Sequence, residues 1–419
     1  MTDYIIGVEW DSSNDSPNLR RIDGGNNTVS SGDWPEFFNS YPIHGNMWRG
    51  IIADNGDYTY GSDAKGTGLT LTTDNVMVRI PRVYVKFEKS GDCWRWWVSP
   101  IPATGFDLHP AFYQRGHSAS PANQIYIGSY DAHDAGSSKL GSKSGSTPLA
   151  SQTIATFETR GNNIGTGWGN MNFHTLCLLQ LLFYVEFASF DSRSKVGPGR
   201  TKSTNSSALA SGGASSYEAA NGTSSGTTDV QAVAWRGIEN LWGNVWQCVI
   251  GYNTTDTEHR IVNRDGTGTL AASLTAGNYE SVTSPIPLNG TTHVSGTDAG
   301  SFCHGYVSDL AIDASNVLGL MFVPDELSGS SDTYLTDYYY SHRSGISQTG
   351  GMLSGNRWDS TTKAGLGCQH STTASSYSDT SIGARLESIM STVDIGPIIP
   401  ISTTSFQFST LGSANAMVI

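Results

Sequence analysis

The stretch RGIENLWGNVWQCVIGYN, residues 236–253, combines two tryptophans with several turn-forming residues. Trp242 and Trp246 are four residues apart, so either a helical turn or an extended strand would place both rings on one face. The Gly-Asn pair between them suits a tight bend that leads into a strand. The amides of Asn240 and Asn244 can satisfy neighbouring backbone groups. The stretch therefore predicts a buried aromatic wall, which is a scaffold feature and not a catalytic one.

The composition around this stretch favours a folded body with an uncharged surface. The chain has 419 residues, a length that allows two or three domains or one elaborated domain. Hydrophobic residues make up 37%, enough for a sizeable core, but charged residues make up only 15%, below the usual quarter. Glycine and hydroxyl-bearing residues replace them. Such a surface is typical of an exposed particle or an extracellular protein, and less so of a cytosolic enzyme.

Charge and hydropathy argue against nucleic-acid and membrane partners. The net charge is −13 and the 24 basic residues form no cluster, so we expect no nucleic-acid binding. The first residues, MTDYIIGVEW, lack a basic region followed by a long apolar stretch, so we expect no signal peptide. The longest apolar run, residues 175–190, is about one turn too short for a bilayer and contains Gln180 and Glu186. We therefore expect no membrane insertion.

Cysteine and histidine spacings indicate no metal or cofactor. The five cysteines are odd in number and widely spaced without a CxxC pair, which predicts neither a zinc site nor a disulfide framework. We expect Cys177 and Cys248 to be buried thiols. Ten histidines are scattered without metal-ligand spacing, so the metal content stays unknown and no cofactor is predicted. His109, which precedes a proline, is interpreted as a hydrogen-bonded turn residue.

Periodicity predicts a β-rich chain with one strong helix. That helix spans residues 171–188, is apolar on all sides, and has Asn170 or Asn172 to cap its start. Glu186 within it needs a partner, expected to be a backbone group or a tryptophan N–H. A hairpin is predicted with its turn at Ser90–Gly91 and a break at Pro81. Further strands are predicted at 4–10, 57–61, 123–132 and, as a buried strand, 317–323.

The domain organisation follows from composition. Residues 1–75 are predicted to be an N-terminal element packed on the main body, which spans 76–400. Residues 197–228 are almost entirely Gly, Ser, Thr, Ala and Asn and read as a long surface insertion. A variable region is placed at about 337–386. Residues 401–419 are taken as a C-terminal tail.

Several short motifs carry a family resemblance. RGIENLWGNVWQ resembles the GNVWEW element of the formylglycine-generating-enzyme type of C-type lectin fold. GGMLSGNRW at 350–358, a polar stretch and SIGARL at 381–386 follow in the order of that fold's GGSW and IGFRL segments. The whole chain more closely resembles variable proteins of diversity-generating retroelements and related phage tail or receptor-binding proteins. The motifs that support this are YIIGVEWDSS, VMVRIPRVYVKFE, GFDLHPAF, QTIATFETRGNNIGTGWG, RGIENLWGNVWQ and IGARL.

The resemblance implies both a fold and a function. It implies an α+β chain with an elaborated C-type lectin fold, rich in irregular loops, on a virion or a cell surface. It implies binding of a protein or glycan ligand on a host or target cell through a C-terminal surface diversified at adenine-containing codons. Residues 338–379 are consistent with this, since they are mostly Tyr, Ser, His, Asn, Asp, Gly, Thr and Cys with few aliphatics, a composition that suits a paratope. Oligomeric state is left open.

Within the variable region we separate frame from display positions. We expect Arg385 to make a buried or half-buried pair or a backbone contact. The frame positions are Gly350, Gly351, Gly365, Ile382, Gly383, Arg385 and Leu386. The display positions predicted to bind ligand are Tyr339, Tyr340, His342, Ser354, Asn356, Trp358, Asp359, Cys368, Gln369, His370, Thr372, Thr373 and Tyr377.

Alternatives to a diversified surface stay open. One is a phage tail-fibre or baseplate protein without diversification, in which this region is a generic polar loop. Another is a carbohydrate-active enzyme, because carboxylate pairs meet only in space, and the Trp94–Trp97 cluster with GFD could form a sugar platform instead of packing in the core. True formylglycine-generating enzymes use two cysteines, and this chain offers only Cys368 there. Iron-dependent relatives need a histidine-rich site, and His174 and His304 form no such set, so we expect no enzyme.

Overall fold

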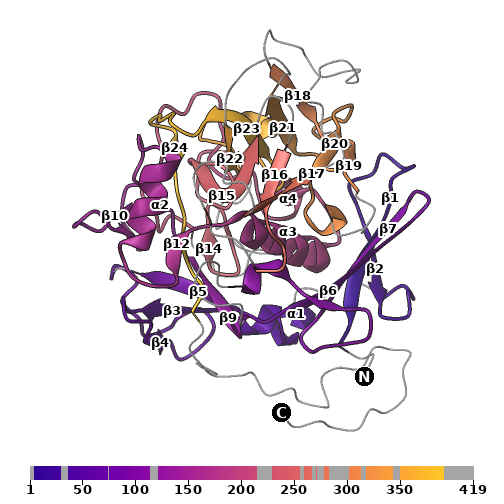
Figure 1. Cartoon of the computed structure of the whole chain (residues 1–419), viewed down its shortest axis with the longest axis horizontal. Coiled ribbons are helices and arrows are strands. Elements are labelled where there is room, and N and C mark those ends of the chain that lie inside the picture. Colours follow the sequence, from indigo (N-terminus) through magenta and orange to yellow (C-terminus); the bar gives the residue numbers. More distant parts are fainter. Residues whose placement is uncertain are drawn as a thin grey trace.

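The structure of the chain is a computed structural model, shown in Figure 1. It describes residues 4–29, 36–73, 75–113, 121–214, 229–254, 259–266, 270, 278–282, 302–312, 318–342 and 350–390. The predicted tail and the insertion residues 215–228 lie outside these ranges. Within them the chain is mostly β-sheet with four α-helices, which is compatible with the α+β expectation. The helices are α1 Glu36–Ser40, α2 Ile154–Asn162, α3 Phe173–Phe187 and α4 Ser192–Lys195, with 3-10 turns η1 His44–Asn46, η2 Pro110–Phe112, η4 Leu318–Leu320 and η5 Thr361–Lys363.

A five-stranded antiparallel sheet contains the predicted hairpin. Its order is β2-β1-β7-β6-β8, with β1 Ile6–Asp11, β2 Arg20–Asp23, β6 Tyr84–Ser90, β7 Cys93–Ser99 and β8 Asp107–Leu108. The turn is confirmed, since Ser90 pairs with Cys93 and Gly91 has a φ of 58°. The rings of Trp94 and Trp96 stack at 6.0 Å and are buried, so they pack in the core as expected.

A six-stranded sheet brings β3, β4 and β5 of the N-terminal part together with β25 of the C-terminal part. Its order is β12-β25-β9-β5-β3-β4, with β3 Trp48–Ile52, β4 Tyr58–Tyr60, β5 Val76–Pro81, β9 Gln124–Gly128, β12 Trp168–Asn170 and β25 Leu386–Ser388. β5 ends at Pro81, where the sequence predicts a break. Residues 1–75 supply β1 to β4, so the predicted N-terminal element is built into the two sheets of the main body.

The third and largest sheet holds most of the C-terminal half. Its order is β17-β16-β15-β22-β23-β21-β18, and β24 pairs with β15 in parallel. The strands are β15 Trp246–Thr254, β16 His259–Val262, β17 Tyr279–Val282, β18 Phe302–Tyr306, β21 Tyr338–His342, β22 Gly350–Ser354, β23 Gln369–Ala374 and β24 Ile382–Gly383. Short two-stranded pairs complete the described elements: β10 His133–Asp134 with β11 Leu140–Gly141, β13 Ala234–Trp235 with β14 Ile238–Glu239, and β19 Asp309–Leu310 with β20 Pro324–Glu326.

The helix α3 lies at the centre of the molecule (Figure 1) and confirms the predicted helix. Asn172 caps it, because its side-chain oxygen accepts from the backbone N–H of His174 at 2.9 Å and Thr175 at 3.2 Å. The helix is buried along nearly its whole length. It belongs to the larger hydrophobic cluster, and Cys177 in it is a buried thiol as predicted.

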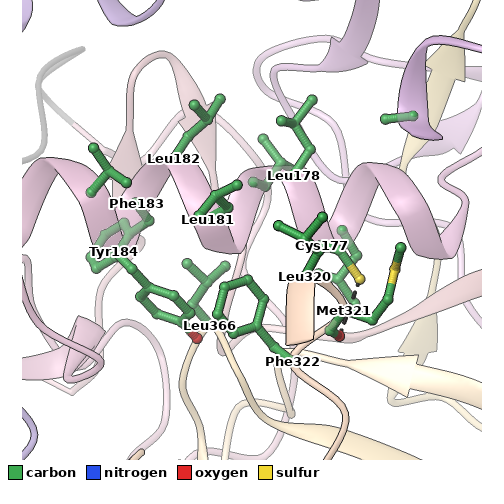
Figure 2. Packing of buried hydrophobic residues seen from close by; sticks show 14 of the residues in the cluster. Cys177, Leu178, Leu181, Leu182, Phe183, Tyr184, Leu320, Met321, Phe322 and Leu366 are labelled. Atoms are coloured by element: carbon green, nitrogen blue, oxygen red, sulfur yellow. Dashed lines mark hydrogen bonds between the residues drawn. The ribbon is translucent and has the colours of Figure 1, made fainter. Parts of the chain in front are cut away.

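The segment 317–323 is not the strand that the sequence predicts. Its described part is the 3-10 turn η4 followed by buried residues that pack on α3, as Figure 2 shows. Cys177 donates its thiol to the Met321 carbonyl at 3.3 Å. Phe322 has a φ of 47°, which a regular strand does not accept. A short buried apolar run gives no periodicity with which to tell these two structures apart.

Glu186, near the end of α3, has the partner that the sequence requires. Trp235 donates its indole N–H to Glu186 at 2.8 Å, and Arg236 forms a buried ion pair with the same carboxylate. Burial alone would raise the pKa of Glu186, but Arg236 and the other donors hold that pKa below its ordinary value. The carboxylate is therefore a structural element of the core.

The two tryptophans of the opening stretch do not form one wall. Trp242 belongs to the cluster around α3, whereas Trp246 belongs to a second hydrophobic cluster. Gly243 and Asn244 lie between them with φ values of 74° and 63°, so the chain turns sharply before β15 begins. The predicted bend is confirmed, and that bend is what directs the two rings into different cores.

No helix among the described residues has the length and apolarity needed to cross a membrane.

Candidate ligand-binding surface

The third sheet has two faces with different surroundings. Successive side chains of a strand point to opposite faces of the sheet. Tyr339 and Met352 point to one face and belong to the hydrophobic cluster around α3. Their neighbours Tyr338 and Leu353 belong to the second cluster, on the opposite face. Parallel pairing of Tyr340 with His370 places these two residues side by side on that same opposite face. We call it the outer face.

The helix α2 covers only part of the outer face. Thr153 caps the helix, and Ile154 in its first turn packs in the second cluster. A Cβ added to Gly351 on β22 would lie 2.1 Å from Ile154 Cδ1, so a larger residue at this predicted frame position would displace the tip of the Ile154 side chain. The covered part of the face is therefore at β15 and β22, and the strands further along the sheet, β23, β21 and β18, extend beyond this contact.

Aromatic rings from four strands gather on the outer face. Tyr340 lies 4.7 Å from Tyr338 and 4.9 Å from His370, between ring centroids. Trp246 lies 5.2 Å from His370. On the other side, Tyr338 lies 4.9 Å from Tyr306. We call this group the outer aromatic cluster; its members are Trp246, His304, Tyr306, Tyr338, Tyr340 and His370.

The cluster is buried at its base and partly open at its edge. Trp246 and Tyr338 are only 7% and 5% exposed. The other four members, Tyr340, His370, His304 and Tyr306, are half-buried. A ring array with this gradient of burial is rigid, because its base is fixed by the core, and still reachable from solvent along its edge. Rigid aromatic area with polar tips is the usual chemistry of a recognition surface.

Hydrogen bonds hold the rings in place. His304 Nδ1 bonds the Tyr338 hydroxyl, and the Tyr306 hydroxyl bonds Thr362 Oγ1 at 2.8 Å. Thr373 Oγ1 bonds His370 Nδ1 at 3.0 Å. Burial raises the pKa of the Tyr306 and Tyr340 hydroxyls, so both stay neutral hydrogen-bonding groups at physiological pH.

Six predicted display positions lie in the interior and are removed from the display set. The reason is strand alternation together with the tight turn after β22, which direct these side chains away from solvent. Tyr339, for example, is fully buried and bonds Ser371 Oγ at 2.9 Å. Asn356 is 1% exposed and donates to the Lys363 carbonyl at 3.2 Å. The buried positions are Tyr339, Ser354, Asn356, Trp358, Cys368 and Gln369.

Other predicted positions do reach the surface. Tyr340 and His370 lie together in the outer aromatic cluster, and Thr373 contacts it through His370. Asp359 is half-buried and pairs with Arg357 at 2.8 Å, and Tyr377 is 51% exposed. The side chains of His342 and Thr372 lie outside the described part of the structure.

Sequence reasoning missed four members of the cluster. They are Trp246, His304, Tyr306 and Tyr338. Tyr338 could have been found from strand alternation with Tyr340, which shares its face. The other three come from β15 and β18, which are distant in sequence and join the site only through sheet pairing.

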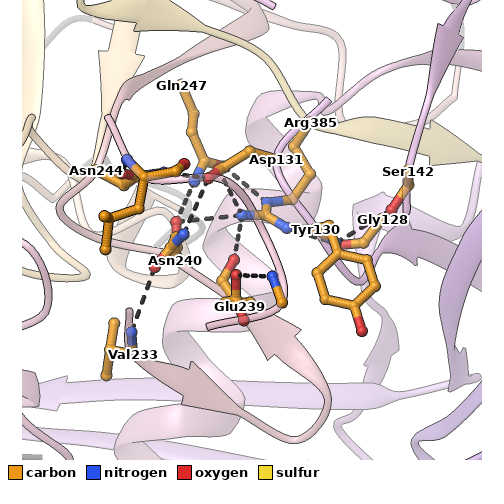
Figure 3. Close-up of polar contacts among 12 residues, drawn as sticks. Gly128, Tyr130, Asp131, Ser142, Val233, Glu239, Asn240, Asn244, Gln247 and Arg385 are labelled. Carbon is orange, nitrogen blue, oxygen red and sulfur yellow. Dashed lines mark hydrogen bonds and ion pairs between the residues drawn. The ribbon is translucent and has the colours of Figure 1, made fainter. Parts of the chain in front are cut away.

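A buried polar network around Arg385 includes Gln247, which follows Trp246 on β15 (Figure 3). Arg385 is fully buried and, as predicted, makes both an ion pair and backbone contacts. It donates to Gln247 Oε1 at 2.8 Å and to the Gly128 carbonyl at 2.7 Å, and it pairs with Asp131 at 3.3 Å. Asn240 and Asn244 donate to the other oxygen of Asp131, at 3.0 and 2.8 Å.

The described part of the Gly/Ser/Thr-rich insertion is attached to this network. Glu239 accepts from the backbone N–H of Gly212 at 2.8 Å and of Ala214 at 2.9 Å. Asn244 accepts from the Leu209 N–H at 2.7 Å. Residues 197–214 are mostly exposed or half-buried, as a surface insertion should be. Burial raises the pKa of Glu239 to about 7.

Asp337 is a further buried carboxyl, and it precedes Tyr338 of the cluster in the sequence. It is 2% exposed and accepts from the Gly367 N–H at 2.8 Å. Burial raises its pKa to about 8 from 3.8. A Cβ on Gly365 would lie 1.7 Å from Asp337 Oδ1, which explains the glycine at this frame position. The carboxyl groups of Glu239 and Asp337 are both buried, whereas a catalytic pair of carboxyl groups must reach its substrate.

Asp337 predicts a specific pH dependence of stability. Its pKa is raised on folding, so the folded state keeps a proton that the unfolded state loses, and stability falls as pH rises from about 4 to about 8. Asp337→Asn should therefore be more stable than the parent at pH 8, with the difference shrinking towards pH 5. Urea denaturation at several pH values measures this. The control Asp332→Asn, at an exposed position, should have the same free energy of unfolding as the parent at every pH. A D337N variant less stable than the parent at pH 8 would contradict the argument.

No group of three or more His, Cys, Asp or Glu side chains that could hold a metal ion occurs among the described residues. His174 is buried with its Nε2 2.9 Å from the Val262 carbonyl, and His109 accepts from the Ala111 N–H at 3.2 Å as a turn residue. Both contacts fit structural roles.

No protein-family model matches this chain, and no curated protein matches it.

Proposed function

We propose that this chain is a ligand-binding protein without catalytic activity, a receptor-binding or display protein of a virus or phage. It acts on a virion or cell surface, and its ligand is a protein or glycan on a target cell. The observation that supports the proposal is the outer aromatic cluster. Rings from β18, β21 and β23, on the part of the sheet that extends past α2, meet Trp246 of β15, and the group is half-open at the edge and fixed at the base.

We further propose that the fold is an elaborated C-type lectin fold of the formylglycine-generating-enzyme type and that a retroelement diversifies its surface. The ordered motifs in the sequence support this proposal. Six positions of the predicted display set are buried, so the diversified surface that we propose is smaller than the sequence predicts. Its described positions are Tyr340, Asp359, His370, Thr373 and Tyr377. Sequencing the flanking DNA tests it. A reverse-transcriptase gene and a template repeat that differs from the gene mainly at adenines should be found, and their absence would refute diversification while leaving ligand binding open.

Two substitutions test the binding surface directly. Tyr340→Ala and His370→Ala should each weaken binding of the labelled protein to target cells by about tenfold or more, because anchoring rings at an interface contribute most of its affinity. Both rings are half-buried, so thermal unfolding should shift little. Flow cytometry over a panel of bacterial strains measures the binding, with differential scanning fluorimetry for stability.

Tyr84 provides a matched control in that panel. It is a half-buried tyrosine on β6 in the five-stranded sheet, away from the outer aromatic cluster. Tyr84→Ala should leave cell binding unchanged. Binding that resists both cluster substitutions, or a parent protein that binds none of the strains, would count against the proposed function.

A further inference from the structure

One cation lies directly on the outer aromatic cluster. Lys363, at the end of η5, places its ammonium nitrogen 4.6 Å from the centroid of the Tyr338 ring. A cation over a tyrosine face is held there by the ring's electrostatic field. The lysine is half-buried, so its ammonium group is positioned by the protein and still reachable. It lies beside the ring that joins Tyr306 and Tyr340 in the cluster.

Within the described residues, Lys363 has no carboxylate partner. Arg357, in the same loop, pairs with Asp359 at 2.8 Å, and Lys86 on β6 pairs with Glu88 at 2.6 Å. Its ammonium group lies over the Tyr338 ring of the aromatic cluster. Its charge is thus available to a ligand.

The charge of this lysine is opposite in sign to the net charge of the whole chain. The net charge is −13, so the protein as a whole repels anions at long range. The cluster itself contributes only neutral tyrosines, a tryptophan and the two imidazoles of His304 and His370. An unpaired ammonium group at such a site complements an anionic group on the ligand at short range.

The chemistry of the cluster edge favours a sugar over a protein surface. The half-open rings all carry a hydroxyl or ring nitrogen, and Thr362 and Thr373 add further hydroxyls beside Tyr306 and His370. Among the described residues, Tyr377 is the one large hydrophobic side chain that is mostly exposed. A stable protein interface has an apolar core within about 800 Å² of contact area per partner. A small, polar-edged ring array fits one or two sugar rings better.

We propose that the outer aromatic cluster binds an acidic glycan, with a ligand carboxylate paired to Lys363 and a sugar ring packed against Tyr340 and Tyr306. This inference rests on the proposed function, since it names the ligand class of the same surface. Tyr340 and Tyr306 flank Tyr338, over which the lysine lies, so a carboxylate and a neighbouring sugar ring can reach the two kinds of group together.

The test uses matched acidic and neutral oligosaccharides. Isothermal titration of the full chain with hexagalacturonate and with 3′-sialyllactose should show binding of at least one. The fully methyl-esterified hexagalacturonate and lactose, their neutral counterparts, should bind about tenfold more weakly or not at all, because a charge-assisted hydrogen bond is lost. Binding of the acidic probe should weaken as NaCl rises from about 50 to about 500 mM.

Lys363→Met should abolish the preference for the acidic probe, weakening its binding about tenfold. Lys89→Met is a matched control, because Lys89 is also half-buried and lies 4.0 Å over the Trp94 ring on the remote hairpin. The Lys89→Met variant loses the same kind of cation–ring contact and should bind the acidic probe as tightly as the parent does. Equal thermal unfolding temperatures for the two variants would exclude a folding defect as the cause.

Each other outcome overturns the inference. Equal binding of acidic and neutral probes, equal behaviour of the two lysine variants, or binding of neither acidic sugar would refute it. Preferential binding of decaglutamate peptide over both acidic sugars would replace the glycan by an acidic protein. The cell-binding experiment with Tyr340→Ala is separate, so the proposed function can stand when the acidic-glycan inference fails.

Discussion

Arg385→Met should be the most damaging single substitution at a polar residue, costing about 3–5 kcal/mol of unfolding free energy. Methionine preserves much of the volume but removes every donor. Asp131 would then be a buried carboxylate without its cation, since both side chains are 0% exposed. The remaining acceptors would also lose their bond; they are Gln247 Oε1 and the carbonyls of Gly128, Glu239 and Asn240.

Urea denaturation of the purified variant measures this loss. Arg20→Met is the control, because Arg20 forms an ion pair with Glu9 at 2.7 Å but is 40% exposed, and such pairs contribute about 1 kcal/mol or less. The double variant Asp131→Asn/Arg385→Met should recover part of the loss, because it leaves no unpaired charge in the core. A loss for Arg385→Met no larger than that for Arg20→Met would refute the structural role of the network.

Tyr339→Ala is expected to have the second largest effect, about 3–5 kcal/mol of unfolding free energy. The Tyr339 ring is fully buried in the cluster around α3, so its removal leaves a cavity. The hydroxyl also bonds Ser371 Oγ at 2.9 Å, and Ser371 would keep only the bond that it donates to the Tyr340 carbonyl. The variant should unfold at much lower urea concentration than the parent.

The neighbouring substitution provides the contrast. Tyr340→Ala removes the same side chain one residue further along β21, from the half-open outer face. It should affect ligand binding far more than stability, whereas Tyr339→Ala should affect stability first. Tyr339→Phe, which removes only the hydroxyl, should cost about 1 kcal/mol. Similar unfolding midpoints for the two alanine variants would mean that the two faces of the sheet are wrongly assigned.

These two residues also show why the outer aromatic cluster depends on its frame. The rings of the outer aromatic cluster are held from below by Trp246 and Tyr338, which are buried, and β15 is held in turn by the Arg385 network through Gln247. Substitutions at the edge of the cluster leave that support intact. A surface built in this way can change its exposed side chains with little cost in stability, which is what a display protein requires.

The sequence by itself determined the features that depend on local interactions. The apolar length of α3 with Asn172 as cap, the hairpin turn at Gly91, the bend at Gly243 and the need of Glu186 for a partner all follow from periodicity, capping and backbone freedom. Each of these depends on residues close together in the chain, or on the cost of burying one charge, and so could be inferred without a structure.

Only the tertiary structure decided which polar and aromatic residues form the candidate site. Composition identified 338–379 as a region rich in paratope-like residues. It could not show that Tyr339 is buried while Tyr340 is half-buried, or that Gln369 is buried while the next residue, His370, is half-buried. The face of a strand to which a side chain points is set by its register with partners, and those partners, β15 and β18, come from elsewhere in the chain. Lys363 likewise meets Tyr338 only because η5 and β21 are brought together by folding.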